Sequence, residues 1–266
     1  MTVHFIGAGP GAADLLTLRA VALLGSSPVC LYAGTYVTAE ILRHCPPGAT
    51  LIDSRNLDLD QITAHLVEAH AEGLDVARLC SGDPSLYSAL TEQTRRLDTA
   101  GVPWDVTPGV PAYAAAAALL GLELTVPEVA QTVILTRTQA ASTRMPAGEA
   151  LGRLAQSRAT LVLHLAIRRT RVIAEELAQA YGPDCPVAVV ASATAADEVV
   201  LRGTLADIAD QVEAAGLRQA AVILVGPALR QTPDRDLVES HLYGRRPRSQ
   251  GSHPTPTEHA EHPTRP

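Results

Sequence analysis

The feature that most constrains the fold is the regular alternation of short apolar runs with helix-like segments in the first half of the chain. Each apolar run ends in a polar or glycine-bearing turn, and this alternation is typical of a mainly parallel sheet flanked by helices. We predict five strands in this half, at residues 3–7, 29–32, 50–53, 76–80 and 104–107. Five strands fill one sheet, which predicts a first α/β domain over residues 1–120.

The second half repeats the alternation with one difference. We predict five further strands, at residues 132–136, 160–163, 187–190, 199–201 and 221–225. The third and fourth of these have only a short connection, which favours an antiparallel pair and therefore a mixed sheet. The chain is thus predicted to form two α/β domains with mixed, mainly parallel sheets, the second domain covering residues 121–231.

Capping signals predict where helices begin. Asp14 precedes an apolar-periodic segment at 15–24, and Asp58 with Gln61 forms a capping box before another helix.

Beyond residue 231 the chain is rich in Arg, Pro, Ser, Thr and His, and we interpret residues 232–266 as a disordered tail. The three tail histidines would at most bind a metal weakly, and a solvated tail is the preferred interpretation; they are His253, His259 and His262.

Composition narrows the classes of partner and location. The net charge is −7, and all 21 basic residues are arginine, so a polyanion-binding protein is not indicated and no nucleic acid partner is expected. No apolar run approaches the roughly 18 residues of a membrane helix and no cleavable signal follows Met1, so we predict no membrane partner and a cytoplasmic location. The four cysteines contain no CxxC pair, which favours buried thiols over disulfides or zinc, and we expect no metal.

A glycine loop follows the first predicted strand. Gly7, Gly9 and Ala12 satisfy the G-x-G-x-x-G/A pattern of dinucleotide-binding proteins, so an NAD(P)-dependent oxidoreductase is one alternative. Two features count against it: Pro10 fixes the loop and removes a backbone donor, and the second strand lacks the terminal acid that holds a ribose. A second alternative is that the glycines only form a tight turn.

Longer motifs give a more specific indication. They are IGAGPG and LLTLRA at residues 6–11 and 15–20, VARLCSGDP at 76–84, VTPGV at 106–110 and QTVILTR at 131–137. In order and spacing the chain resembles the tetrapyrrole (precorrin) methylase family, up to the Val-Gly-Pro that ends at residue 227. Residues 81–87, 124–127 and 131–137 are most similar to members that methylate C11 of precorrin-4.

The resemblance implies a fold, a cofactor and a reaction. Such enzymes bind S-adenosylmethionine (SAM) in a bent form in the cleft between two α/β domains, and they act as homodimers on a tetrapyrrole small-molecule substrate. The implied cofactor contacts are Pro10, Ser81, Gly82, Asp83, Leu86, Pro111, Ala112, Leu165, Ala193 and Gly226. The implied substrate contacts are Gly9, Gly11, Tyr113 and Arg137, with Arg55 and Arg78 as further arginines for substrate carboxylates.

Simpler interpretations stay open for several of these residues. Asp83 with Pro84 equally fits the start of a helix, Leu86 and Tyr113 fit core packing, and Arg55 and Arg78 fit a protein surface. The functional alternatives within the family are a uroporphyrinogen III methyltransferase and a ribosomal RNA methylase. A tetrapyrrole carrier without activity is a third, from another class. No covalent nucleophile is needed, and the sequence assigns no catalytic base.

Overall fold

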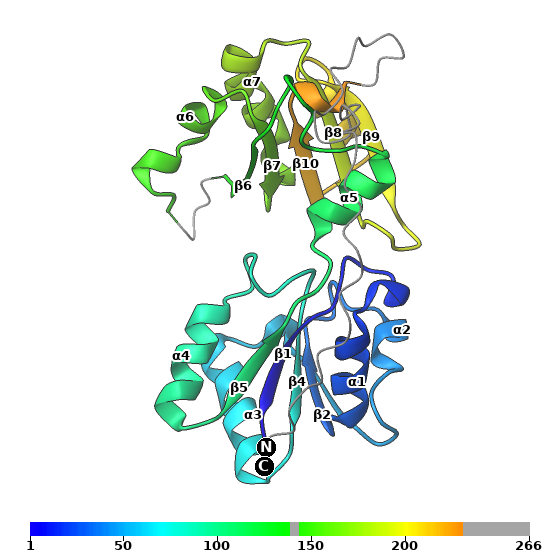
Figure 1. Cartoon of the computed structure of the whole chain (residues 1–266), viewed down its shortest axis with the longest axis vertical. Helices are drawn as coiled ribbons and strands as arrows, with labels where there is room; N and C mark the ends of the chain where they lie inside the picture. Colours follow the sequence, from blue (N-terminus) through cyan, green and yellow to red (C-terminus); the bar gives the residue numbers. More distant parts are fainter. Residues whose placement is uncertain (139–143, 231–266) are drawn as a thin grey trace, which may run out of the picture.

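The computed structural model describes residues 1–138 and 144–230, which form two lobes stacked along the long axis of the molecule (Figure 1). Each lobe is built on a five-stranded sheet, with strand orders β3-β2-β4-β1-β5 and β6-β7-β10-β8-β9. The predicted α/β fold with two sheets is therefore confirmed. The predicted tail and its histidines lie outside the described residues.

The first sheet is parallel throughout. Its strands are β1 (Val3–Gly7), β2 (Val29–Tyr32), β3 (Thr50–Asp53), β4 (Val76–Cys80) and β5 (Trp104–Thr107), with the bounds that the apolar runs predicted. The central strands β1 and β4 are almost entirely buried because helices cover both faces. A parallel sheet brings the carboxyl ends of all five strands to one edge, so the loops after β1, β4 and β5 meet there.

In the described part of the chain, helices cover both faces of the first sheet (Figure 1). They are α1 (Leu18–Ser26) and α2 (Ala39–Leu42) on one face, and α3 (Leu59–Ala71) and α4 (Leu90–Ala100) on the other. Two short 3₁₀ turns, η1 (Ala13–Leu15) and η2 (Ser54–Asn56), complete the lobe. The capping box of Asp58 and Gln61 at α3 is confirmed. The start predicted at Asp14 is wrong: Leu16 and Thr17 are extended, and the Thr17 hydroxyl accepts the Ala20 amide to cap α1.

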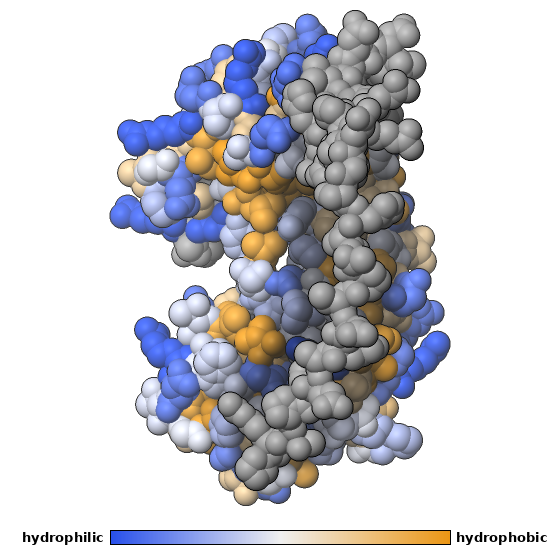
Figure 2. Space-filling view, viewed as in Figure 1, coloured by the Kyte–Doolittle hydropathy of each residue, from blue (hydrophilic) through white to orange (hydrophobic). Residues whose placement is uncertain are grey.

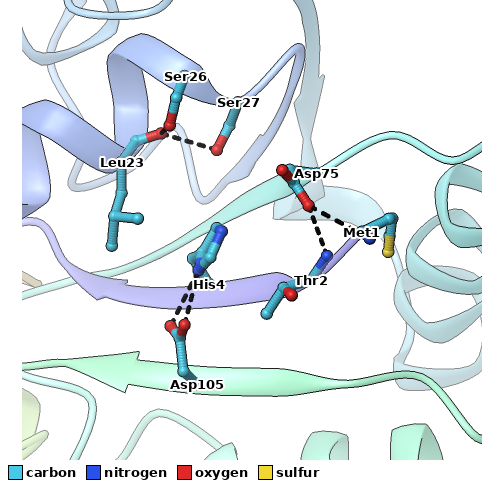
Figure 3. Close-up of polar contacts among 8 residues, drawn as sticks. All are labelled: Met1, Thr2, His4, Leu23, Ser26, Ser27, Asp75 and Asp105. Carbon is cyan, nitrogen blue, oxygen red and sulfur yellow. Dashed lines mark hydrogen bonds and ion pairs between the residues drawn. The ribbon is translucent and has the colours of Figure 1, made fainter. Parts of the chain in front are cut away.

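Polar contacts fix the position of the first strand (Figure 3). The Asp75 carboxylate accepts a hydrogen bond of 2.6 Å from the Thr2 amide and lies 3.9 Å from the amino terminus of Met1. His4 Nδ1 lies 2.9 and 3.0 Å from the two carboxylate oxygens of Asp105 on β5. These contacts tie β1 to both of its neighbours and so help to set the register that delivers the glycine loop to the sheet edge.

The second sheet is mixed. Its strands are β6 (Val133–Arg137), β7 (Thr160–His164), β8 (Pro186–Ala191), β9 (Val199–Thr204) and β10 (Ala221–Val225). Only β6 and β7 pair in parallel; the predicted antiparallel pair of β8 and β9 is confirmed, and β10 runs antiparallel to both β7 and β8. The description "mainly parallel" thus holds for the first sheet alone. The short connection between β8 and β9 accounts for the reversal of that pair.

Helices cover the second sheet on both faces as well. They are α5 (Ala112–Leu120), α6 (Leu151–Ala155), α7 (Thr170–Tyr181) and α8 (Ile208–Ala214), with 3₁₀ turns η3 (Ala147–Glu149), η4 (Ile167–Arg169) and η5 (Pro227–Leu229). The alanine-rich α5 packs its small side chains on β7, β8 and β10, so the chain crosses between the lobes before this helix. The domain division at residues 120 and 121 stays a prediction. Within residues 1–138 and 144–230, no helix is long and apolar enough to cross a membrane.

Candidate active site between the lobes

Three glycines interlock at the carboxyl edge of the first sheet. A Cβ on Gly7 would lie 2.4 Å from the Gly109 nitrogen and 2.8 Å from the Gly82 oxygen, and a Cβ on Gly109 would lie 2.2 Å from the same oxygen. Gly9 and Gly82 also exchange two backbone hydrogen bonds, of 3.1 and 2.8 Å. The loops after β1, β4 and β5 are therefore packed backbone against backbone, which only residues without a side chain allow.

This packing counts against the dinucleotide alternative. A dinucleotide fingerprint uses its glycines to let a pyrophosphate approach the amino end of the next helix. Here the space beside Gly7 is filled by Gly109 and Gly82. The following helix α1 begins only at Leu18, after a 3₁₀ turn and two extended residues. The glycine loop therefore packs against Gly82 and Gly109 and leaves no space for a pyrophosphate beside Gly7.

The Asp83 side chain connects the loops after β4 and β5 at the same edge of the sheet. One carboxylate oxygen accepts the Ser85 amide at 2.8 Å and the Ser85 hydroxyl, and the other accepts the Gly109 amide at 2.8 Å. Partial burial opposes its ionisation, but the hydrogen bonds from Ser85 and Gly109 outweigh that cost and hold the pKa of the carboxyl below 3.8. The helix-start interpretation of Asp83 and Pro84 is wrong, because α4 begins only at Leu90.

The glycine loop also reaches the second lobe. A Cβ on Gly11 would lie 2.9 Å from the Ala193 oxygen, so the two backbones are in direct contact. The Ala12 amide donates to the Thr194 hydroxyl at 3.0 Å, and the Thr194 amide donates to Glu198 at 2.7 Å. The structure thus brings the predicted residues Gly11 and Ala193 together, one from each lobe.

Strained backbone gathers at the strand ends around this junction. Positive φ angles occur at Tyr87 (54°) and Ala89 (55°) after β4, at Leu165 (53°) after β7, and at Ser192 (47°) and Thr194 (67°) after β8. A non-glycine residue in this region costs energy and persists where the surroundings impose it, often at functional sites. Leu165 also exposes 70% of its surface.

A polar cluster joins the lobes beside these loops. Arg137 ends β6 and is the register partner of His164, which ends β7, so both side chains lie on the same face of the second sheet. The Tyr87 ring comes from the first lobe, with its centroid 5.4 Å from that of His164. We call Tyr87, Arg137 and His164 the interlobe cluster. The sequence analysis identified Arg137 but missed His164. The one sequence feature that could have indicated His164 is its position as the last residue of a buried strand, directly before the predicted contact Leu165.

Burial sets the protonation states of the cluster. It lowers the pKa of His164 below 6.5, so the imidazole is neutral at physiological pH. It raises the pKa of Tyr87 above 10, an effect that Arg137 opposes and Glu149 reinforces. The Nε2 atom of His164 is buried and has no hydrogen-bond partner in the described part of the chain. An unpaired buried nitrogen is costly, and in a native protein it calls for an explanation.

Other predicted residues are placed as follows. Pro111 and Ala112 lie against Gly82, since a Cβ there would be 3.4 Å from Pro111 Cα and 3.5 Å from the Ala112 nitrogen. Gly9 and Pro10 lie in the glycine loop, Ser81 is exposed, and Leu86 is half-buried. Tyr113 packs against the core beneath α5, which supports its core-packing interpretation.

Two predicted residues, Gly226 and Arg78, are not brought to this junction. Gly226 ends β10, which runs antiparallel to β7 and β8, so it contacts Thr160 at the opposite edge of the second sheet from Leu165. Arg55 is exposed and pairs with Asp53 at 2.7 Å. Arg78 is 8% exposed and donates to Gln93 and to backbone carbonyls inside the first lobe. Arg78 is therefore not positioned for a ligand between the lobes, whereas Arg55 follows β3 at the carboxyl edge of the first sheet and its role stays a prediction.

The space-filling view shows the molecule hollowed between the lobes, with hydrophobic residues on both sides of the hollow (Figure 2). In the described part of the chain, no group of three or more His, Cys, Asp or Glu side chains is arranged to hold a metal ion. The junction therefore offers glycine backbone, apolar surface and a small polar cluster. These groups suit binding and orientation of an organic ligand.

Comparison with known proteins identifies the family. The model of the tetrapyrrole (corrin/porphyrin) methylases matches residues 2–209. The chain belongs to this family. It is 60% identical to the precorrin-4 C(11)-methyltransferase of Rhodococcus erythropolis, over 91% of this chain and 96% of the relative. It is 39% identical to the cobalt-precorrin-4 C(11)-methyltransferase of Methanocaldococcus jannaschii, over 85% and 88%. The predicted family and the predicted class of enzyme, a methyltransferase, are confirmed.

Solved structures agree with this assignment. The crystal structure of a cobalt precorrin-4 methyltransferase superposes with a TM-score of 0.83 at 37% identity, covering 86% of this chain and 96% of that one. A uroporphyrin-III C-methyltransferase from Thermus thermophilus, solved with S-adenyl homocysteine, superposes with a TM-score of 0.72 at 27% identity, covering 86% and 94%.

Proposed function

We propose that this protein transfers a methyl group from SAM to C11 of precorrin-4 in cobalamin biosynthesis. The observation that carries the proposal is the order of identities among family members. Relatives named for precorrin-4 are 60 and 55% identical, those named for cobalt-precorrin-4 are 39 and 37% identical, and a siroheme synthase is 34% identical. Sequence identity is therefore highest with relatives named for precorrin-4 and lower with relatives that are named for another substrate or product.

The junction between the lobes fits a cofactor such as SAM. The bare backbone of Gly82 and Gly109 lets a flat group approach closely. The exposed side chain of Leu165 supplies apolar surface to pack on an adenosine. We assign the cofactor to Gly82, Leu165 and Ala193, together with the other predicted contacts on these loops, which are Pro10, Ser81, Asp83, Leu86, Pro111 and Ala112. Bound SAM supplies a methyl group that is already activated by its positively charged sulfur.

The residues of the chain would contribute position and shelter from water. Asp83 holds the loops after β4 and β5 at a fixed spacing through its bonds to Ser85 and Gly109. The contacts of Gly11 and Ala12 with the loop at 192–195 hold the two lobes in one orientation. Holding two reactants in line removes much of the entropic barrier to displacement, and no covalent nucleophile is required.

The substrate would lie next to the cofactor, against the interlobe cluster. Arg137 ends β6 in the interlobe cluster, where its guanidinium donates to the carbonyls of Thr138 at 3.4 Å and Arg144 at 3.3 Å. A substrate carboxylate would replace these bonds with two parallel hydrogen bonds from the guanidinium. Gly9 and Gly11 would form part of the wall of the trough, and Tyr113 stays a weaker candidate for contact. The cytoplasmic location, the homodimer and the lack of a metal requirement stay predictions.

The second candidate substrate is cobalt-precorrin-4. The structural superposition with a cobalt precorrin-4 methyltransferase, at a TM-score of 0.83, favours it. Both candidates use the same fold and the same reaction, so only the substrate separates them.

A competition assay tests the choice. Purified protein is given labelled SAM with precorrin-4, cobalt-precorrin-4 or uroporphyrinogen III, and kcat/KM is measured for each. We expect precorrin-4 to give the highest kcat/KM. A higher value for cobalt-precorrin-4 would establish the second candidate, and a higher value for uroporphyrinogen III would refute both.

A further inference from the structure

We propose that His164 is the base that accepts the proton released by the tetrapyrrole when it is methylated. The proposal rests on the proposed function and adds a residue to which no sequence motif assigns a role. Its geometric basis is the interlobe cluster: His164 ends β7 beside Arg137, meets Tyr87 from the other lobe at 5.4 Å between ring centroids, and carries a buried Nε2 without a partner.

The chemistry of the reaction requires such a group. A carbon of the macrocycle uses an electron pair to form the new C–C bond, and the methyl–sulfur bond breaks with its pair staying on sulfur. The sulfonium loses its positive charge, and the macrocycle gains one. The macrocycle returns to its original charge by releasing one proton, from a ring nitrogen or a neighbouring carbon. The Nε2 lone pair of a neutral imidazole can take up this proton.

The other members of the interlobe cluster and Asp83 are poor acceptors, and Glu149, whose charge reaches Tyr87, is an exposed residue of η3. Arg137 is a permanent cation and has no lone pair to offer. Tyr87 stays a neutral phenol because burial raises its pKa above 10. Asp83 already accepts hydrogen bonds from Ser85 and Gly109, and its pKa lies below 3.8, which makes it a weak base. Among the three residues of the interlobe cluster, His164 alone is neutral and basic near physiological pH.

Tyr87 explains how a buried nitrogen can meet a ligand. Its ring packs against the imidazole, and its backbone sits at a φ of 54°, a conformation that costs energy for tyrosine. The residue belongs to a loop and is 46% exposed, so a ligand can displace it without breaking a core contact. We therefore expect substrate binding to move the Tyr87 ring and to place the macrocycle against His164.

The test compares the full-length wild type with His164→Gln. Glutamine retains a polar side chain but does not titrate. We expect kcat to fall by about 100-fold or more, the lower bound for general base catalysis, while the KM for SAM and the affinity for S-adenosylhomocysteine stay close to wild type. In the wild type, kcat should decline as the pH falls through the lowered pKa of His164, because protonated His164 cannot accept a proton, and this decline should disappear in the variant.

Controls separate catalysis from structure. His65→Gln, on α3 in the first lobe, is the matched substitution and should leave kcat unchanged. His164→Ala opens space beside Arg137, and added imidazole should restore part of its activity, which it could not do for a purely structural defect. Thermal melting of each variant shows whether it is folded.

The outcomes are distinguishable. Methyl transfer to precorrin-4 by the wild type decides the proposed function independently of the variants. Given that transfer, loss of kcat with loss of the acidic decline and rescue by imidazole supports the base. A His164→Gln enzyme with wild-type kcat, or one that is slower but keeps the acidic decline and is not rescued by imidazole in the alanine form, overturns it.

Discussion

Gly109→Ala is the most direct perturbation of the interlocked loops. The backbone at Gly109 does not have a positive φ, so alanine meets no conformational barrier there. The barrier is space alone: the new Cβ would lie 2.2 Å from the Gly82 oxygen and 2.7 Å from Gly7 Cα. Both neighbours are backbone atoms inside or directly after sheet strands, so they cannot rotate away as a side chain would.

The size of the effect follows from this geometry. Overpacking by one methyl group typically costs about 1–3 kcal/mol, and clashes with backbone on two sides place this variant near the upper end, at about 3 kcal/mol. For a protein of this size, each kcal/mol lowers the melting temperature by roughly 2–4 °C. We therefore expect a fall of about 6–12 °C. Affinity for S-adenosylhomocysteine should fall as well, because the loops after β1, β4 and β5 are pushed apart.

Calorimetry and urea unfolding measure the stability, and titration calorimetry measures the affinity. Gly148→Ala is the matched control, since a Cβ there meets no atom within 4 Å, and it should change the free energy of unfolding by at most about 0.5 kcal/mol. If Gly109→Ala melts and binds like the wild type, the loops are not held in contact and the description of the site is wrong.

Three further predictions follow from single contacts. Asp83→Asn should lower the free energy of unfolding, measured in urea, by about 1 kcal/mol, since the site is partly exposed and solvent screens the lost charge. The carboxylate's contribution to the free energy of unfolding is present above pH 3.8 and is lost as the pH falls through its lowered pKa. Thr194→Val should cost about 1 kcal/mol by removing the acceptor of the Ala12 amide, whereas Thr194→Ser should melt like the wild type. Arg137→Ala should raise the KM for the tetrapyrrole by roughly 10- to 100-fold without changing S-adenosylhomocysteine affinity by titration calorimetry, and an unchanged KM would exclude Arg137 from substrate binding.

The strands were predictable because their information is local. The five strands of the first sheet are short apolar runs bounded by turn residues, and the pattern alone located them. The start of α1 was not predictable from Asp14, because Thr17 is also a capping residue type and Asp14 itself lies in the 3₁₀ turn η1. The Ala12 amide just before this turn donates to Thr194 of the second lobe, a contact that local sequence does not reveal.

The candidate site was predictable only in part. The glycines and the Asp83 motif identified the loops after β1 and β4, because glycine in a sequence indicates a position where a side chain does not fit. The strained conformations of Leu165 and Thr194 left no such record, because neither residue type favours a positive φ. Gly226 was misplaced relative to Leu165 because the direction of β10 depends on how the second sheet is assembled. His164 gained significance only once the fold put Tyr87 against it.

We propose that this member of the tetrapyrrole methylase family methylates C11 of precorrin-4. The most direct measurement combines the purified protein, isotopically labelled SAM and enzymatically generated precorrin-4, and locates the new methyl group by mass spectrometry and NMR. We predict one labelled methyl on C11 and one equivalent of S-adenosylhomocysteine. Label at another position, or label transferred only to uroporphyrinogen III or to RNA, would contradict the claim while leaving the fold intact.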